Sequence, residues 1–342
     1  MNLNTTSILE NKEVQAQIVK KTKFHRKKWC SGVEEIFKIM HIKKNNILPK
    51  NLVSLANETP PISVALVCAD QNVAMESTKI AYELNLVNPI FIGNKNKILK
   101  EAEILNWNIN NFEIFDEDDQ NKAASIGSVL AKENKIKVLV KGDLHTDILM
   151  RSYLKKEFNL LQGKRLSHIW HMTTPNNDKP LFITDGALNV LPRVDVKMHI
   201  LSNAIEFTKK IGITKPRVAV LSGTEDPIES MPSSVEAKEV MNRAKKGNFD
   251  AYVYGPLAFD NAVSMEAAHI KNIKNEVAGQ TDILLVPNLE TGNSLCKMMV
   301  YYLDACAAGL VVGGKIPVVV PSRADNVVSR VASIAASVIA TK

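Results

Sequence analysis

The sharpest combination of reactive side chains in the chain is Ser322, Arg323 and Asp325. They follow the apolar run 317–320, which has strand length, and a helical pattern comes after them. A serine hydroxyl and the forked donors of an arginine suit a phosphate or a developing oxyanion, and a nearby carboxylate can act as a base. The competing interpretation is helix capping, with Ser322 or Asp325 as the N-cap and Arg323 on the surface. Local sequence does not decide between the two.

Two further polar turns follow apolar runs. One contains Lys141, His145 and Thr146, and the other contains Thr291 and Asn293. In open α/β sheets, ligands bind beyond the carboxyl ends of the strands, where helix N-termini offer free N–H groups. These five residues are therefore predicted to bind an anionic substrate. Taken alone, each segment is equally consistent with a plain turn followed by a helix N-cap. A single histidine is more often structural than catalytic.

Apolar runs of strand length alternate with helical patterns from residue 62 onward. Strands are expected at 62–68, 89–92, 112–115, 136–140, 218–221, 251–253, 281–286 and 317–320. Helices are expected at 71–86, 98–105, 120–133, 196–211 and 326–339, after residue 233 and from residue 258. Such alternation predicts a largely parallel sheet. The runs 165–172 and 180–184 have no helix between them, which predicts an antiparallel pair.

The predicted fold class is α/β, with two three-layer α/β domains flanking a cleft. A chain of 342 residues with 45% apolar content is long enough for two cores. Residues 1–60 form a basic N-terminal extension, and the breaks around 45–55 and at the prolines 60–61 separate it from the rest. Domain I is predicted to combine 61–162 with 304–342, and domain II to span 163–303.

The charge of the chain is concentrated at its N-terminal end. Residues 1–60 contain ten lysines and one arginine against five glutamates, so nearly all of the formal charge of +7 lies there. The chain after residue 60 is therefore not expected to bind nucleic acid, and a polyanion-binding role is confined to the segment around 20–28. A solvated helix face in a chain rich in lysine and asparagine is the favoured interpretation. Residues 33, 36, 37 and 40 have the spacing of one helix face.

Several classes of function lack their sequence signals. No apolar run reaches the roughly 18 residues of a membrane span, and no secretory signal pattern begins the chain. The cysteines at positions 30, 68, 296 and 306 have no zinc or paired spacing, so free thiols in a reducing cytoplasm are expected and a metal site is not. The glycine patterns of dinucleotide sites, P-loops and nucleophile elbows are missing too. What remains is group transfer that involves phosphate.

Seven motifs, in order along residues 62–342, together resemble the phosphate acetyl/butyryltransferase family. They read VKGDLHT from Val140, SHI from Ser167, FITDGALN from Phe182, YGPLAFDNA from Tyr254, VAGQTDILLVP from Val277, ETGN from Glu290 and SRAD from Ser322. Within this family, the sequence is most similar to the butyryltransferase-like branch. The leader 1–60 lies outside the resemblance.

The resemblance implies two α/β domains around a cleft, a fold similar to isocitrate and isopropylmalate dehydrogenases, and a homodimer. It implies the reaction acyl-CoA + phosphate ⇌ acyl phosphate + CoA, without a metal, a cofactor or a covalent acyl-enzyme. Ser322 would bind the thiol or a phosphate oxygen, and Arg323 would hold phosphate and stabilise the tetrahedral oxyanion. The acetyl-specific branch has an aspartate base at the position of Ser329, so Asp325 is the nearest substitute here.

The leading prediction is therefore a cytoplasmic phosphate acetyltransferase whose partners are acyl-CoA, CoA and inorganic phosphate, with no membrane or nucleic acid. A phosphate butyryltransferase, or an enzyme for another short acyl-CoA, is the alternative, because pocket volume sets acyl length. A metal- and NAD-dependent dehydrogenase of similar fold is a less favoured alternative. A third hypothesis has the basic leader dock the protein to a polyanion or another partner.

Overall fold

The computed structural model describes residues 47–161, 163–175 and 177–342. The predictions for the leader before residue 47, including its helix and its docking role, lie outside these residues. The strands are β1 Ile62–Val67, β2 Val87–Gly93, β3 Ile114–Asp116, β4 Val138–Lys141, β5 Ser167–Thr174, β6 Asn177–Thr184, β7 Arg217–Leu221, β8 Tyr252–Leu257, β9 Ile283–Leu285, β10 Cys306–Val312 and β11 Val318–Val319.

The helices connect these strands. They are α2 Lys50–Ala56, α3 Asn72–Glu83, α4 Lys95–Ile104, α5 Gln120–Lys132, α6 Thr146–Tyr153, the 3-10 turn η1 Lys156–Phe158, α7 Val194–Lys210, α8 Pro232–Lys246, α9 Phe259–Val263, α10 Met265–Ile270, α11 Leu289–Tyr302 and α12 Val327–Ala340. Within the described residues, no helix is long and apolar enough to cross a membrane.

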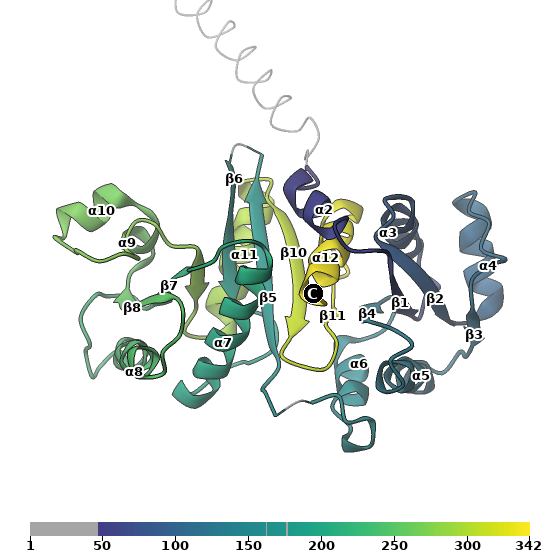
Figure 1. The fold of residues 1–342 in the computed structure, drawn as a ribbon, viewed down its shortest axis with the longest axis horizontal. Coiled ribbons are helices and arrows are strands. Elements are labelled where there is room, and N and C mark those ends of the chain that lie inside the picture. The colour runs from purple at the N-terminus through teal and green to yellow at the C-terminus, as the bar shows by residue number, and fades with distance from the viewer. Residues whose placement is uncertain (1–46, 162, 176) are drawn as a thin grey trace, which may run out of the picture. The chain divides into compact units, whose positions relative to one another are not determined.

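The described strands form one mixed sheet in the order β3-β2-β1-β4-β11-β10-β5-β6-β9-β7-β8 (Figure 1). β10 runs antiparallel to both β11 and β5, and β5 pairs antiparallel with β6, as predicted. The other pairs are parallel. The α/β class is thus confirmed. The sheet runs through both predicted domains, and the boundaries at 162/163 and 303/304 stay a prediction.

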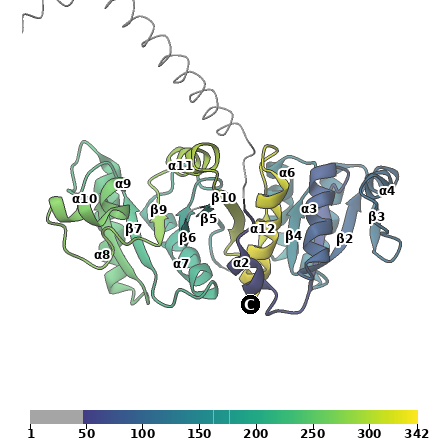
Figure 2. The same cartoon turned by 90° about the horizontal axis from the view of Figure 1, so that it is seen from above.

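Helices cover both faces of the sheet. Val64 and Leu66 of β1 pack in one core with α3, α7 and α12, whereas Ala65 and Val67 face a second core formed with α5 and α6. A third core packs α11 against β5, β6 and β9. Seen from above, α11 lies on the side of the sheet away from α7 (Figure 2). The alternation of side chains along each strand therefore fills both layers.

β10 and α6 are not among the predicted elements, and α2 overlaps a predicted break. β10 was not predicted, because its buried sequence CAAGLVV has no polar alternation and cannot be told from a helix by periodicity. The break expected at 45–55 was wrong in part, since α2 begins at Lys50 with Pro49 as its N-cap. A proline is tolerated at a helix start, where its missing N–H has no partner to lose, so here it begins a helix.

Gly142 fixes how closely β1 and β4 approach at their carboxyl ends. Its N–H donates to Val67 O at 2.8 Å, and the N–H of Asp143 donates to Cys68 O at 2.8 Å. A Cβ at Gly142 would lie 2.0 Å from Cys68 O, a backbone atom that cannot move aside. The loop after β4 can therefore follow this path only with glycine at position 142.

Gly142→Ala should destabilise the fold by about 1–3 kcal/mol or more, because the added methyl group pushes β4 away from β1. The measurement is the midpoint of urea unfolding. Gly223→Ala is the matched control, since its Cβ would meet only the flexible end of Met231, at 3.3 Å. Equal midpoints for the two variants would contradict this account of the loop.

Candidate active site

The loops after β4 and β11 lie at one edge of the sheet. Val318 and Val319 of β11 pair with Leu139 and Val140 of β4 in parallel register. Because both strands run the same way, the loop that begins after Lys141 and the turn 322–325 follow side by side. The register thus brings together two of the three predicted polar turns.

A contact between Arg323 and His145 joins these two turns. Nη2 of Arg323 lies 3.3 Å from Nε2 of His145, and both side chains are exposed. A guanidinium only donates, so in this contact the histidine nitrogen must be an unprotonated acceptor. His145 also occupies the N-cap position of α6, although its side chain makes no cap bond. The structure therefore places His145 where it can orient Arg323.

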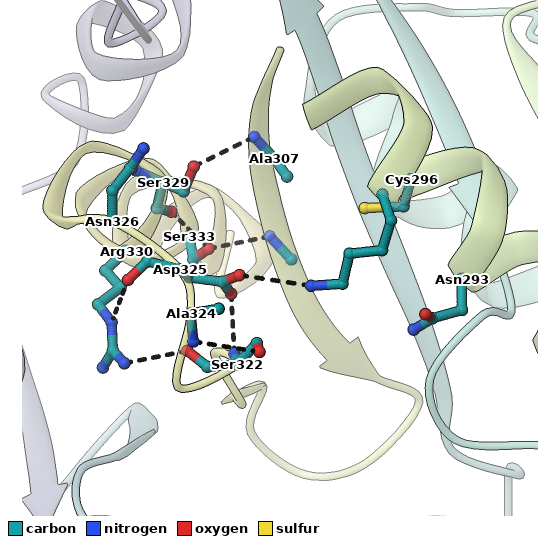
Figure 3. Close-up of polar contacts among 12 residues, drawn as sticks. Asn293, Cys296, Ala307, Ser322, Ala324, Asp325, Asn326, Ser329, Arg330 and Ser333 are labelled. Atoms are coloured by element: carbon teal, nitrogen blue, oxygen red, sulfur yellow. Dashed lines mark hydrogen bonds and ion pairs between the residues drawn. The ribbon is translucent and has the colours of Figure 1, made fainter. Parts of the chain in front are cut away.

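Arg330 holds the turn 322–325 from beneath. Its side chain is 3% exposed; Nε donates to Asp325 O at 3.2 Å and Nη2 donates to Ser322 O at 3.0 Å (Figure 3). Burial lowers the pKa of this guanidinium, and the nearby Asp325 opposes that shift. One side chain on α12 thus fixes both ends of the turn that carries the predicted catalytic residues.

Asp325 closes the turn from the other side. Its Oδ2 accepts the N–H of Ser322 at 2.8 Å, and its Oδ1 lies 4.0 Å from Nζ of Lys297 on α11 (Figure 3). The N-cap of α12 is Asn326, whose Oδ1 accepts the N–H of Ser329 at 2.9 Å. The capping interpretation of Ser322 and Asp325 is therefore wrong.

Lys141 adds a buried cation to this edge. It is 4% exposed, and its Nζ donates to Leu144 O at 2.9 Å and to Gly142 O at 3.3 Å. Burial lowers its pKa, and the charges of Arg330 and Arg323 lower it further. Three cations thus converge around the turn, while its own carboxylate is engaged by Ser322 and Lys297. Such an arrangement favours an anionic ligand.

The remaining predicted residues are Thr146, Thr291 and Asn293. Thr146 is exposed at the start of α6, and its side chain makes no hydrogen bond within the described residues. Oγ1 of Thr291 donates to the N-cap residue Asn288 at 2.7 Å, and Nδ2 of Asn293 donates to Gly186 O at 3.4 Å. No hydrogen bond or ion pair in the described ranges joins these three to the turn.

Sequence reasoning missed Arg330 and Lys297. Each is a cation in a mostly apolar helix, VVSRVASIAASVIA for α12 and LETGNSLCKMMVYY for α11. A charge is rarely buried without a partner, so a cation in such a helix was the available signal. Ser329 is 4% exposed, and its Oγ accepts the N–H of Ala307 at 3.4 Å, so it points at β10.

The described residues contain no group of three or more His, Cys, Asp or Glu side chains that could hold a metal ion. The chemistry that the site can supply from its own side chains is charge stabilisation by Lys141, Arg323 and Arg330. A hydroxyl from Ser322 and a carboxylate from Asp325 complete it. Together these groups can bind and stabilise an anion.

Comparison with known proteins identifies the family. A profile of the family described as "Phosphate acetyl/butaryl transferase" matches residues 117–338. A phosphate acetyltransferase of Rhizobium meliloti is 38% identical over 279 residues, which are 81% of this chain and 88% of that protein. A phosphate butyryltransferase of Clostridium beijerinckii is 36% identical over 285 residues, 83% of this chain and 94% of that protein. The chain belongs to this family of acyltransferases.

Solved structures agree with the family at the level of the fold. A branched-chain phosphotransacylase from Enterococcus faecalis V583 has a TM-score of 0.73 and 30% identity, and the match covers 82% of this chain and 99% of that one. A 4-hydroxythreonine-4-phosphate dehydrogenase from Klebsiella pneumoniae has a TM-score of 0.54 and 10% identity, with 82% and 100% covered. The second likeness shows a shared fold and nothing about activity.

Arg330→Met should loosen the turn 322–325 while the fold stays stable. The variant loses two hydrogen bonds from a charged donor, and each contributes about 1.5–3 kcal/mol. It also no longer has to bury a charge, which offsets this loss in the free energy of unfolding. Hydrogen exchange of the amides of residues 322–325 should therefore accelerate by about tenfold or more, with little change in the urea midpoint.

Arg330→Lys should have an intermediate effect, because an ammonium lacks the planar fork that reaches both carbonyls. Arg151→Met is the control, since Arg151 pairs only with Asp147 on the exposed face of α6. Unchanged exchange at the turn in Arg330→Met would show that Arg330 does not hold it.

Proposed function

We propose that this protein is a phosphate acetyltransferase, which interconverts acetyl-CoA plus phosphate with acetyl phosphate plus CoA in a ternary complex. The observation that carries the proposal is the convergence of Lys141, Arg323 and Arg330 on the turn of Ser322 and Asp325. Family membership supports the same reaction. The reaction as proposed uses CoA as a substrate and needs no cofactor or metal.

In the direction of acetyl-CoA synthesis, the CoA sulfur attacks the carbonyl carbon of acetyl phosphate. A C–S bond forms and the carbonyl oxygen becomes an oxyanion; the C–O bond to phosphate then breaks, and phosphate leaves with that electron pair. Asp325 is the proposed acceptor of the thiol proton. Arg323 would stabilise the oxyanion and the departing phosphate, and the hydroxyl of Ser322 would bind the thiol or a phosphate oxygen.

The other predicted residues fit supporting roles in this proposal. Lys141, held in place by two carbonyls, would add positive potential behind the phosphate, and His145 would orient Arg323. Thr146 at the start of α6, and Thr291 and Asn293 in the first turns of α11, are proposed contacts for the substrates. Holding two anions in one geometry lowers the barrier by proximity as well as by charge.

Butyryl-CoA, or another short acyl-CoA, is the alternative substrate. It is supported by the similar identities to the acetyltransferase and the butyryltransferase, 38% and 36%. The butyryltransferase also covers slightly more of the chain. Acyl length depends on the volume beside the reacting carbonyl, which the family pattern does not determine.

Three further proposals concern the whole protein. The likeness to a dehydrogenase supports a fold of the isocitrate/isopropylmalate dehydrogenase type, with two α/β domains flanking a cleft. A homodimer is proposed from the family resemblance.

Cys68, Cys296 and Cys306 are free and buried, and burial raises each pKa to about 12. Free thiols that are unreactive support a location in a reducing compartment, which we propose to be the cytoplasm.

The test is release of CoA from acetyl-, propionyl- and butyryl-CoA, with and without phosphate. Phosphate-dependent release with the highest kcat/KM for acetyl-CoA is expected. A higher kcat/KM for butyryl-CoA would select the alternative. No release above the phosphate-free control with any of the three would overturn the proposed function.

Arg323→Gln should lower turnover by about a hundredfold or more, since one preorganised donor at such a site contributes about 3 kcal/mol. Arg323→Lys keeps the charge but loses the fork, so it should also impair turnover, though less. Thermal stability should change little because the side chain is exposed. Arg151→Gln is the control for a surface arginine. Near-normal turnover of Arg323→Gln at saturating substrates would remove Arg323 from the site.

A further inference from the structure

A cavity of about 280 Å³ lies at the opposite edge of the sheet from the candidate active site. Ile136 and Lys137, which directly precede β4, line it, as do residues 314–317, which directly precede β11. Since β4 and β11 are parallel, their amino ends share one edge, while Lys141 ends β4 and Ser322 follows β11 at the other edge. α7 and the end of α12 supply the remaining walls. This cavity is therefore separate from the proposed transfer site.

The walls of the cavity are strongly basic. Five lysines line it: Lys137, Lys164, Lys210, Lys315 and Lys342. Glu206 is the single acidic residue among the lining residues, and its carboxylate accepts from Lys164 at 2.7 Å and lies 3.7 Å from Lys210. The hydrogen bond from Lys164 lowers the pKa of Glu206. Lys342 pairs with Glu58, outside the lining, at 3.1 Å.

Two of the five ammonium groups also donate to backbone carbonyls. Nζ of Lys210 donates to Ala340 O at 2.8 Å, and Nζ of Lys315 donates to Lys132 O at 2.7 Å. A carbonyl oxygen orients an ammonium but does not neutralise it. Lys137 makes no side-chain hydrogen bond or ion pair within the described residues. The five lysines therefore leave a surplus of positive charge over Glu206 and Glu58 around the cavity.

Asn203 supplies an unused acceptor among the lining residues. Its side chain is 3% exposed, and Nδ2 donates to Arg165 O at 2.8 Å and to Ser167 Oγ at 2.9 Å. Its Oδ1 is buried and has no hydrogen-bond partner within the described part of the chain. A buried carbonyl normally has a donor, so a ligand hydroxyl at this wall would complete it.

We propose that this cavity binds a small phosphate monoester that carries a free hydroxyl group. All the cations that line it are lysines, which bind phosphate as point charges, and none is an arginine fork suited to a planar carboxylate. The volume of about 280 Å³ is below the range of drug-sized pockets and too small for a whole CoA molecule. The dianion of the ester would balance the surplus ammonium charge, and its hydroxyl would donate to Oδ1 of Asn203.

The test is calorimetric titration of the full chain with glycerol phosphate, in the presence of saturating CoA. Saturable binding of one equivalent per chain is expected. Lys137→Gln/Lys164→Gln should weaken it by about tenfold or more, since two charged contacts are lost. Lys245→Gln on the exposed face of α8 is the control and should bind as the unchanged protein does. Arg323→Gln should also bind normally, because the transfer site is not involved.

The probe itself tests the role of Asn203. Propyl phosphate, which lacks the hydroxyl groups, should bind about tenfold more weakly than glycerol phosphate, and glycerol alone should not bind. No saturable binding of glycerol phosphate, or undiminished binding to Lys137→Gln/Lys164→Gln, would overturn the site. Loss of binding in Arg323→Gln would place the probe in the transfer site instead. Equal binding of the two esters would overturn the part assigned to Asn203. None of these outcomes depends on whether the protein transfers acyl groups.

Discussion

The candidate active site depends on the pairing of β4 with β11. Only two residue pairs are in register, yet they place the loop after Lys141 beside the turn 322–325, although the two segments lie far apart in the chain. β10 reaches the same edge by running antiparallel to β11, and α12 packs over the junction. Without this short parallel contact, Lys141 of β4 and the groups of the turn would not meet.

The pairing concentrates charge where an apolar sheet ends. Lys141 and Arg330 are both almost fully buried, and burial lowers the pKa of each. The protein places backbone carbonyls around them, so the cations are ordered but not neutralised. A site that holds desolvated positive charge in place before a ligand arrives needs little reorganisation when an anion binds. The cost of burying those charges is offset by the cores on both faces of the sheet.

The same two strands separate two basic regions. Their carboxyl ends lead into the turn with Arg323, whereas their amino ends follow the lysine-lined cavity near Lys137 and Lys315. The strands between are short and wholly buried, so solvent does not connect the two regions along them. Each region can therefore attract anions independently, and a ligand at one need not compete with a ligand at the other.

The sequence by itself determined the α/β alternation, the antiparallel pair β5–β6 and the family, because these depend on local periodicity and on contiguous motifs. It also pointed to Lys141, His145, Ser322, Arg323 and Asp325. It could not reveal β10, whose uniformly buried residues carry no alternation. It left capping open at 322–325, and the structure decided only that part of the question, because Asn326 is the N-cap of α12. Only the tertiary structure decided that Lys141 and His145 meet the turn 322–325, because the pairing of β4 with β11 joins segments that lie far apart in the chain.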